Sequence, residues 1–292
     1  MNINNIDRYS LSKIEDKLRK NELPFSGVTR LGSAAFHFLK PSFYAGIAMH
    51  AGNRVRPEVQ RYLMANGKDR FREEDPYTDY LIRELPIQII GCDSRFEYDL
   101  NRSPERAIYA TKIRSWGLEI WKDDLPQKER NISISKHREF HGLMDIVTGY
   151  LLNQNRYALL FDMHSFCYQR DSAVPWYEDP KPEINLGTEA VNREVFGPAI
   201  NRFIQEISTT KIDGHQIRVA ENEIFRGGYL ARRLCRNHYR DLLFLAIEYK
   251  KLFMNELTGE LHEEKLERLI SGFSHAAEEL ISSGFFAKQD SV

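Results

Sequence analysis

The chain has few of the features that mark secreted, membrane-bound or metal-thiolate proteins. Its three cysteines, Cys92, Cys167 and Cys235, are scattered without a CxxC pair, which disfavours both a disulfide framework and a thiolate zinc site. No apolar run is long enough to cross a bilayer, and the first twenty residues are polar and charged, without an apolar signal segment. We therefore expect a cytoplasmic, reduced protein that has no membrane partner.

An excess of charge of either sign is also absent. The 292 residues carry 41 basic and 42 acidic side chains, so the formal net charge is −1. Such a balance provides no overall field to hold nucleic acid, which makes that partner an unfavourable expectation. The sequence has no repeat and no linker rich in Gly, Ser or Pro, while 42% of it is hydrophobic, which is enough for one large core. We expect a single domain over residues 1–292, and the sequence leaves its oligomeric state open.

Short apolar runs alternate along the chain with longer helical patterns, which indicates an α/β fold. The expected strands show little alternation of polar and apolar residues, as in a mostly parallel sheet that is covered on both faces; they are residues 43–49, 87–92, 157–162, 217–220 and 242–248. The expected helices are residues 56–66, 78–85, 135–153, 189–207 and 260–283. We expect the segment 107–130 to be irregular and peripheral.

Polar side chains follow several of these strands at the point where each one ends. His50, Asp93, His164 and Glu248 occupy such positions. In open α/β sheets, ligands bind beyond the carboxyl ends of the strands, so we expect these side chains to converge. A single histidine of this kind would be explained equally well by a structural hydrogen bond.

Two histidines beside carboxylates favour a metal site. Hydrolytic zinc sites use three His, Asp or Glu ligands and keep one position for water. Asp162 lies two residues before His164 and could orient its imidazole, or could act only as a turn or capping residue. Asn53 occupies the position of the glutamate in a His-x-x-Glu motif, and an amide is a poor zinc ligand, so the third ligand stays open.

Six carboxylates are candidates for that third ligand: Glu58, Glu74, Asp75, Asp79, Asp93 and Glu97. Glu58 is disfavoured because its helix would lead away from His50. Asp79 lies near the start of an expected helix, where a carboxylate is stable and easily aimed at a site, although it could equally be an ordinary first-turn charge.

Glu248 closes the apolar run FLAIEYKK and is a candidate general base. A carboxylate at the end of a buried strand has to be paired, hydrogen-bonded or protonated, and partial burial raises its pKa toward neutrality. The alternative is a salt bridge to Lys250, Lys251 or a nearby arginine. Beside two candidate zinc ligands, the catalytic role is favoured.

Two further segments could bind a substrate anion. If FEYDLNR (96–102) is extended, Glu97, Asp99 and Asn101 face one side, and Arg102 at its end could grip a carboxylate with two hydrogen bonds. In FRGGYLARR (225–233), two glycines allow close approach of a ligand, and Arg232 or Arg233 could meet an anion. Each signal alone is weak.

Together these segments resemble the N-formylglutamate amidohydrolase family. The matching pieces, in chain order, are MHAGNRVRPEV, TDYLIREL, YDLNRSPERAIY, LLFDMHSF, INLGT, FRGGYLAR and LAIEYKK. They cover roughly residues 43–109 and 156–256, which leaves an N-terminal extension (1–40) and an insertion at about 110–155. Two departures, Tyr229 where histidine is common and Asn53 where a small hydroxyl residue is common, bear on the substrate more than on the metal.

The family's relation to zinc carboxypeptidases and aspartoacylase implies a three-layer αβα fold of the phosphorylase/hydrolase-like type, with a mostly parallel mixed sheet and one zinc ion. The resemblance assigns the zinc ligands to His50, Asp79 and His164, and the catalytic carboxylate to Glu248. It assigns substrate binding to Arg54, Asn101, Arg102 and Arg232.

The activity implied by the resemblance is zinc-dependent hydrolysis of the amide bond of an N-formyl or N-acyl amino acid, such as N-formylglutamate. The expected partner is therefore a small carboxylate-bearing substrate. A deacylase or peptidase for another small acidic substrate is the main alternative. A non-catalytic binding module on the same fold is the alternative from a different class, and the two histidines and Glu248 argue against it.

Overall fold

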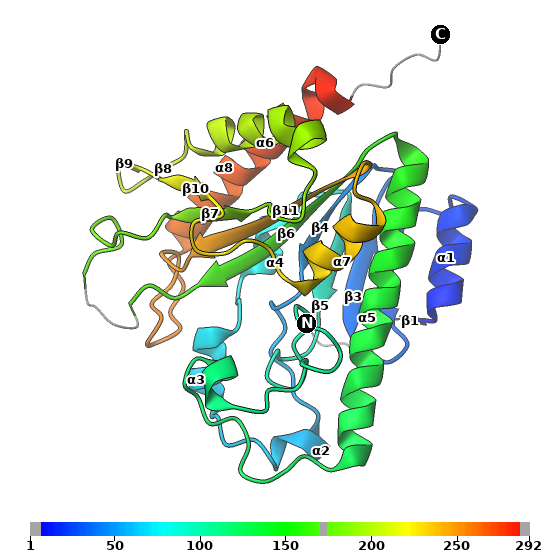
Figure 1. The fold of residues 1–292 in the computed structure, drawn as a ribbon, viewed down its shortest axis with the longest axis vertical. Coiled ribbons are helices and arrows are strands. Elements are labelled where there is room, and N and C mark those ends of the chain that lie inside the picture. Colours follow the sequence, from blue (N-terminus) through cyan, green and yellow to red (C-terminus); the bar gives the residue numbers. More distant parts are fainter. Residues whose placement is uncertain (1–6, 170–173, 287–292) are drawn as a thin grey trace.

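The protein is built around one nine-stranded mixed sheet. A computed structural model describes residues 7–169 and 174–286. Within these ranges the strand order across the sheet is β1-β2-β3-β5-β4-β6-β11-β7-β10, and a separate small hairpin is formed by β8 (Lys211–Ile212) and β9 (His215–Gln216) (Figure 1). The α/β class and the mostly parallel character of the sheet are as the sequence predicts.

The centre of the sheet is parallel. Neighbouring strands β5, β4, β6 and β11 all pair in parallel; their bounds are Ile87–Gly91, Tyr44–Ala48, Ala158–Phe166 and Leu242–Lys250. All four were expected from their apolar runs, because strands buried on both faces have near-continuous hydrophobic sequences. β6 and β11 run on past the expected ends, so His164 lies within β6 rather than after it, and Glu248 lies two residues before the end of β11.

The two sides of the sheet are made of strands that the sequence reveals less clearly. β1 (Arg8–Tyr9), β2 (Phe25–Thr29) and β3 (Ala34–Phe38) form one side, so the N-terminal segment belongs to the main sheet. On the other side, β7 (Ile184–Gly187) pairs antiparallel with β11, and β10 (Val219–Glu221) pairs parallel with β7. Only β10 among these five was expected.

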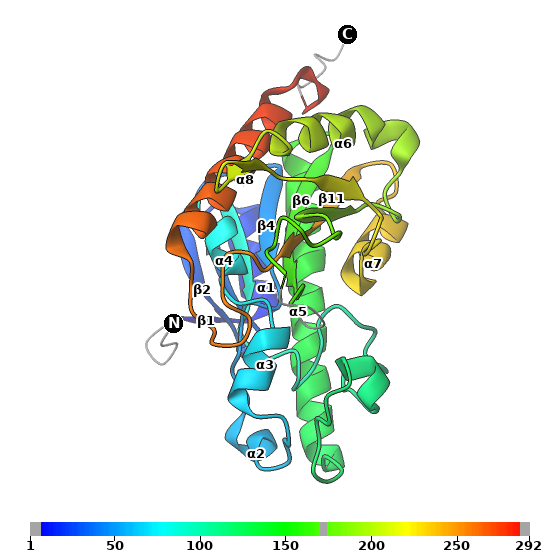
Figure 2. The same cartoon turned by 90° about the vertical axis from the view of Figure 1, so that its left-hand side faces the viewer.

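Helices cover both faces of the sheet and complete three layers. α1 (Leu11–Arg19), α5 (Gln127–Gln154) and α7 (Tyr229–Asn237) lie on one side, and α4 (Thr78–Leu81), α6 (Arg193–Ile207) and α8 (Glu263–Ser282) lie on the other (Figures 1 and 2). α2 (Pro57–Gln60) and α3 (Gly67–Glu73) lie below the sheet, and α2 is near the lower end of α5. Two 3₁₀ turns, Lys112–Ser115 and Gly284–Phe286, complete the described elements.

Several helix boundaries follow from local chemistry. The helix expected at 56–66 is only α2, because Asn66 caps a new helix, α3: its side-chain oxygen accepts hydrogen bonds from the amides of Lys68 and Asp69. Asn192 caps α6 in the same way. α5 begins eight residues before the expected position 135, and a partly buried ion pair between Arg56 and Glu129 (2.6 Å) anchors this polar first part.

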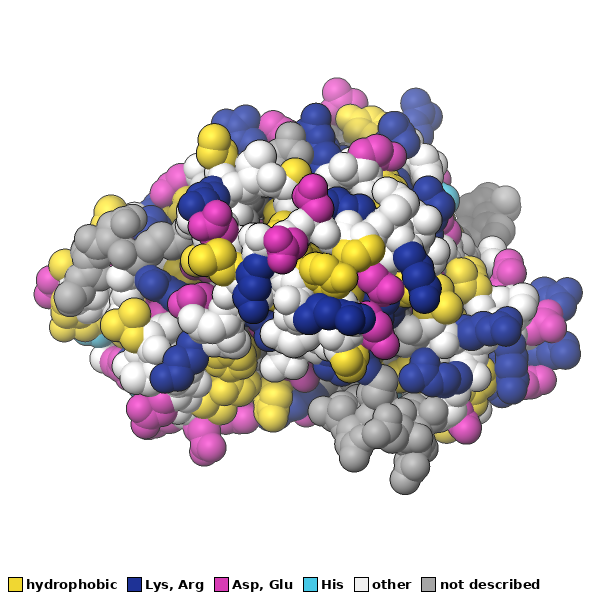
Figure 3. Space-filling view, turned by 90° about the horizontal axis from the view of Figure 1, so that it is seen from below, with side chains coloured by type: hydrophobic (Ala, Val, Ile, Leu, Met, Phe, Trp, Pro, Cys, Tyr) yellow, Lys and Arg dark blue, Asp and Glu magenta, His cyan; other side chains and the backbone are white. Residues whose placement is uncertain are grey.

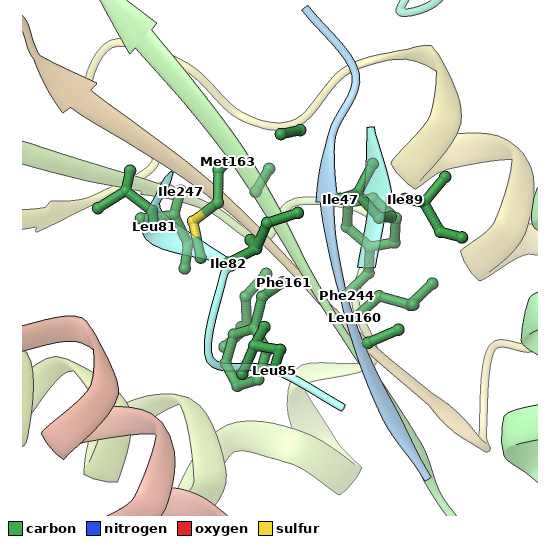
Figure 4. Close-up of a cluster of buried hydrophobic side chains, with 14 of the residues drawn as sticks. Ile47, Leu81, Ile82, Leu85, Ile89, Leu160, Phe161, Met163, Phe244 and Ile247 are labelled. Carbon is green, nitrogen blue, oxygen red and sulfur yellow. The ribbon is translucent and has the colours of Figure 1, made fainter. Parts of the chain in front are cut away.

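The main hydrophobic core covers both faces of the sheet, under α5 and α7 on one side and under α4, α6 and α8 on the other. Figure 4 shows Ile47, Ile89 and Leu160 on one side of the strands and Phe161 on the other. Each of these four side chains is fully buried. Truncating a buried aromatic such as Phe161 to alanine typically lowers the free energy of unfolding by about 3–5 kcal/mol. This packing therefore stabilises the sheet that positions the polar residues at its edge.

The segment 107–130 is irregular as expected, but it is not peripheral throughout. Tyr109 and Ile120 are buried in a second, smaller hydrophobic cluster with Leu63, Ala65 and Phe96. Its chain path is fixed by a hydrogen bond from Trp121 Nε1 to the carbonyl oxygen of Tyr109 (2.8 Å). This burial could not be expected from the sequence, because isolated apolar side chains in a loop have no periodicity that would reveal it.

The surface carries both signs of charge. Seen from below, basic and acidic side chains alternate over the face without a field of one sign (Figure 3). In the part of the chain that the structure describes, none of the helices has the length and apolar character needed to span a membrane.

Candidate active site

Three parallel strands bring the expected histidines and glutamate together. His50 lies two residues beyond β4, while His164 and Glu248 are paired neighbours in the register of β6 and β11. All three line one open cavity of about 750 Å³ at this edge of the sheet. The convergence predicted from the strand ends is therefore observed for these residues.

Asp75 is the third member of the buried group. Its Oδ2 atom lies 3.0 Å from His164 Nδ1 and 3.3 Å from His50 Nδ1. Candidate ligand atoms of His50, Asp75 and His164 all lie within 4.8 Å of one another, and no other such group of three occurs among the described residues. The three side chains are each at most 3% exposed.

Asp79, the third ligand implied by the resemblance, is not part of this group. The chain makes a turn after Asp75, with Tyr77 in the left-handed region (φ 66°), and α4 begins only at Thr78. Asp79 lies in the first turn of α4, where its carboxylate is hydrogen-bonded to backbone amides, and burial raises its pKa. Asp75, by contrast, is held beside the site by a hydrogen bond from its own amide to the carbonyl oxygen of His50 (3.1 Å).

Each histidine contacts a second carboxylate with its other ring nitrogen. His50 Nε2 lies 2.8 Å from Asp99 Oδ1, and His164 Nε2 lies 2.9 Å from Asp162 Oδ2. Because a carboxylate accepts, each Nε2 is the donor, and a neutral ring then presents the Nδ1 lone pair toward Asp75. The contact of Asp162 is the one that its position before His164 suggested.

The carboxylates of this cluster favour a positive charge among them. Burial opposes a charge on His164, but Asp162 and Glu248 beside it raise its pKa well above the ordinary value. Burial likewise opposes the charge of Asp75, yet the neighbouring His164 and His50 lower its pKa. Two atoms in the group, His50 Nδ1 and Asp75 Oδ1, are buried without a hydrogen-bond partner in the described structure. The donor set and these two atoms fit a divalent cation.

Glu248 has the environment of a general base. Burial raises its pKa to about 7, Asp75 and Asp162 act in the same direction, and His164 opposes them. The alternative of a salt bridge to the following lysines is not observed. Lys250 contacts Glu183 (2.8 Å), and Lys251 donates to the carbonyl oxygens of Arg72 (2.5 Å) and Glu74 (2.6 Å).

Arg95 is the residue of the site that the sequence did not reveal. Its guanidinium donates to Asp99 Oδ2 (3.0 Å) and to the Tyr109 hydroxyl (3.2 Å), and it lies over the ring of Trp116 at 4.5 Å. It also lies 3.9 Å from Asp75 Oδ1, with only 12% of its side chain exposed. An arginine in a loop carries no spacing signal, so only the fold shows that a fixed cation faces the cavity.

The segment 96–102 turns instead of running extended. The amide of Glu97 donates to Ser94 O (2.9 Å) and the amide of Arg102 donates to Asp99 O (3.2 Å), so the two expected faces do not exist. Glu97 points away to Arg56 (2.6 Å). Asn101 and Arg102 line the cavity, and Arg102 Nε lies 3.3 Å from Asp99 Oδ2.

The other expected carboxylate-binding arginines differ in position. Arg232 lines the cavity from α7 and donates to the carbonyl oxygen of Gly227 (2.6 Å). Arg54 does not line it. Its guanidinium donates to the carbonyl oxygens of Cys92 (3.1 Å) and Gly32 (2.8 Å) and to Asp93 Oδ1 (3.1 Å), so Arg54, which the resemblance assigns to substrate binding, links strand ends in this structure.

The remaining carboxylate candidates have other partners. Asp93 accepts from Tyr98 and pairs with Lys136 (2.5 Å). Glu74 accepts from the Ser94 hydroxyl, and burial raises its pKa. Neither belongs to the group of His50, Asp75 and His164.

The fold and this site define an α/β protein with a buried His-Asp-His group beside a glutamate and an arginine. A family model described as N-formylglutamate amidohydrolase matches residues 47–254. The chain belongs to the N-formylglutamate amidohydrolase family and is an amide-hydrolysing enzyme, which confirms the resemblance read from the sequence.

Two solved structures share the fold. An N-formylglutamate amidohydrolase from Ralstonia eutropha has a TM-score of 0.62 at 17% identity, over 81% of this chain and 93% of that one. A gene product of Agrobacterium tumefaciens has a TM-score of 0.60 at 18% identity, over 90% and 97% of the two chains. No curated protein sequence matches the chain significantly.

Proposed function

We propose that the enzyme is a zinc-dependent amidohydrolase that cleaves the amide bond of an N-formyl or N-acyl amino acid such as N-formylglutamate. The observation that carries this proposal is the buried group of His50, Asp75 and His164, with Glu248 beside it in the cavity. The cavity volume of about 750 Å³ lies in the usual range for small-molecule sites.

The Nδ1 atoms of both histidines and the carboxylate of Asp75 would hold the metal. A zinc ion bound there supplies a Lewis acid for the substrate carbonyl and lowers the pKa of a bound water to about 7. Asp99 and Asp162 fix the ring orientations through the Nε2–H groups, and such outer partners make the ligand nitrogens more basic.

Glu248 moves the proton in the proposed reaction. Its carboxylate takes a proton from the attacking water and then delivers it to the nitrogen of the leaving amine. A pKa of about 7 suits both steps at neutral pH, because the group can accept and return the proton at little cost. Arg95 provides a fixed positive charge at the cavity wall, where the oxyanion of the tetrahedral intermediate develops.

Arg102 and Arg232, with Asn101, bind the carboxylates of the substrate in this proposal. Planar guanidinium groups suit carboxylates, and holding both ends of a small acid orients its amide bond. Tyr229, where histidine is common in the family, lines the same wall and bears on which acid is accepted.

The proposal includes a cytoplasmic location, supported by the three cysteines, all of which are free.

The function is tested by metal analysis of the purified protein and an amine-release assay over N-formyl and N-acetyl amino acids. We expect about one zinc per chain and the highest kcat/KM on an acidic N-formyl amino acid. Full activity of the metal-free protein would contradict the mechanism. Preference for an N-acetyl or peptide substrate would instead identify a deacylase or peptidase that uses the same residues.

A further inference from the structure

The turn that carries Asn101 and Arg102 is held in place by hydrogen bonds to its backbone carbonyl oxygens. Leu100 O accepts from His141 Nε2 at 3.0 Å, and Arg102 O accepts from His137 Nε2 at 2.9 Å. Between them, Asn101 O accepts from the amide of Tyr229 at 3.2 Å. Residues 100–102 are called the 100–102 turn. All three of its carbonyl oxygens are therefore bound by other elements of the fold.

The two histidines form a pair on one face of α5. They are four residues apart, and their ring centroids are 4.4 Å apart. A carbonyl oxygen only accepts, so both rings carry their proton on Nε2. Both Nδ1 atoms are buried and have no hydrogen-bond partner within the described structure. Burial lowers the pKa of His137, and lowers that of His141 to about 3, so both rings are neutral donors at neutral pH.

The opposite side of the turn packs closely against the start of α7. The amide of Leu230 donates to Asn101 Oδ1 (3.3 Å). A Cβ atom on Gly228 would lie 2.0 Å from Asn101 Oδ1, so only glycine allows this approach. The turn is thus clamped between α5 and α7, with Asn101 and Arg102 on the cavity wall. Neither His137 nor His141 is among the residues that line the cavity.

We propose that His137 and His141 are positioning residues for substrate binding: by holding the carbonyls on both sides of Asn101, they orient Asn101 and Arg102 toward a substrate carboxylate. This inference rests on the proposed function, which assigns carboxylate binding to the turn. Both residues lie on α5, so this helix contributes to specificity without touching the substrate. A pair of neutral donors suits this task because a charged ring would leave a buried Nδ1–H without an acceptor.

The test compares two polar substitutions that differ only in reach. In His137→Gln and His141→Gln, the side-chain amide can place an N–H near the position of Nε2, whereas His137→Asn and His141→Asn end near the position of Nδ1. The substrates are N-formyl-L-glutamate and its analogue with an amide-capped α-carboxylate. Zinc content and thermal unfolding are recorded for every variant.

We expect each Asn variant to raise KM for the free acid about tenfold, as for the loss of a positioning hydrogen bond. KM for the capped analogue, kcat and zinc content should change less than about threefold, and the Gln variants should stay close to the wild type. Val147→Ala, at a fully buried position further along α5, is the matched control. It should lower the unfolding temperature without changing the ratio of the two KM values.

Equal KM increases on both substrates, loss of zinc, or equal effects of Asn and Gln would overturn the proposal. Hydrogen–deuterium exchange of residues 100–103 gives a readout that does not depend on turnover, with faster exchange expected in the Asn variants alone. A wild-type enzyme without amidase activity would contradict the proposed function. Unchanged exchange in the Asn variants would contradict the positioning role by itself.

Discussion

Replacing Glu248 with glutamine should lower activity and raise stability in the same protein. The substitution keeps the size of the side chain and removes the proton acceptor. General acid–base groups typically contribute about 10²–10⁴-fold, so kcat should fall by roughly this factor. KM should change little, because Arg102 and Arg232 are untouched, and zinc content should stay the same if the metal is held by His50, Asp75 and His164.

The stability effect follows from the pKa of Glu248. Burial raises it from 4.5 to about 7, so the folded protein binds a proton that the unfolded chain releases between these pH values. The contribution of Glu248 to the stability of the metal-free protein is therefore fully present below about pH 4.5 and is lost as pH rises through about 7. The difference between the two pKa values corresponds to about 3 kcal/mol at most, and water in the cavity reduces it, so we expect Glu248→Gln to gain about 1–3 kcal/mol at pH 8.

The assay is urea unfolding of metal-free wild type and variant at pH 5 and pH 8, together with turnover of the zinc-loaded proteins. The stability gain should be large at pH 8 and small at pH 5. Glu97→Gln is the matched control, because Glu97 is a buried glutamate bound to Arg56 and not to the site. It should lose stability and keep turnover. Near-normal turnover of Glu248→Gln, or its loss of zinc, would refute the assignment of Glu248 as the base.

Two further predictions concern substrate binding and the outer carboxylates. Arg102→Lys should raise KM for a free-acid substrate about tenfold and leave KM for an amide-capped analogue nearly unchanged, because lysine keeps the charge but not the two-pronged geometry. The control Arg54→Lys should leave both KM values unchanged. An equal rise of KM for both substrates in Arg102→Lys would make Arg102 structural. Asp162→Asn should weaken zinc affinity about 10–100-fold by replacing the anionic acceptor of His164 Nε2–H with a neutral amide, as measured by competition with a chelator; unchanged affinity would contradict that role.

The centre of the fold could be predicted because its sequence signal is strong. β4, β5, β6 and β11 are continuous apolar runs, as parallel strands with two buried faces require. β7 was missed because INLG is only four residues long and stands beside turn residues. The strands that border the sheet on the N-terminal side were missed for similar reasons, since FSGVT contains a glycine and a polar residue.

The site was predictable where a residue is tied to a strand. His50, His164 and Glu248 follow or end apolar runs, so the topology alone brings them together. Asp75 lies in the loop before α4 and Asp79 lies in the first turn of that helix. Their spacing cannot show that the turn at Tyr77 places Asp75, and not Asp79, beside the histidines. Arg95 and His137 reach the site region from a loop and from a long helix, and their positions depend on tertiary packing that the sequence does not encode locally.

The measurement that tests the account most directly is the zinc content of wild type, Asp75→Asn and Asp79→Asn by inductively coupled plasma mass spectrometry. The two aspartates are four residues apart, but only Asp75 faces His50 and His164. The account predicts about one zinc per chain in wild type and in Asp79→Asn, and loss of most of the zinc in Asp75→Asn. Zinc retained in Asp75→Asn and lost in Asp79→Asn would contradict it.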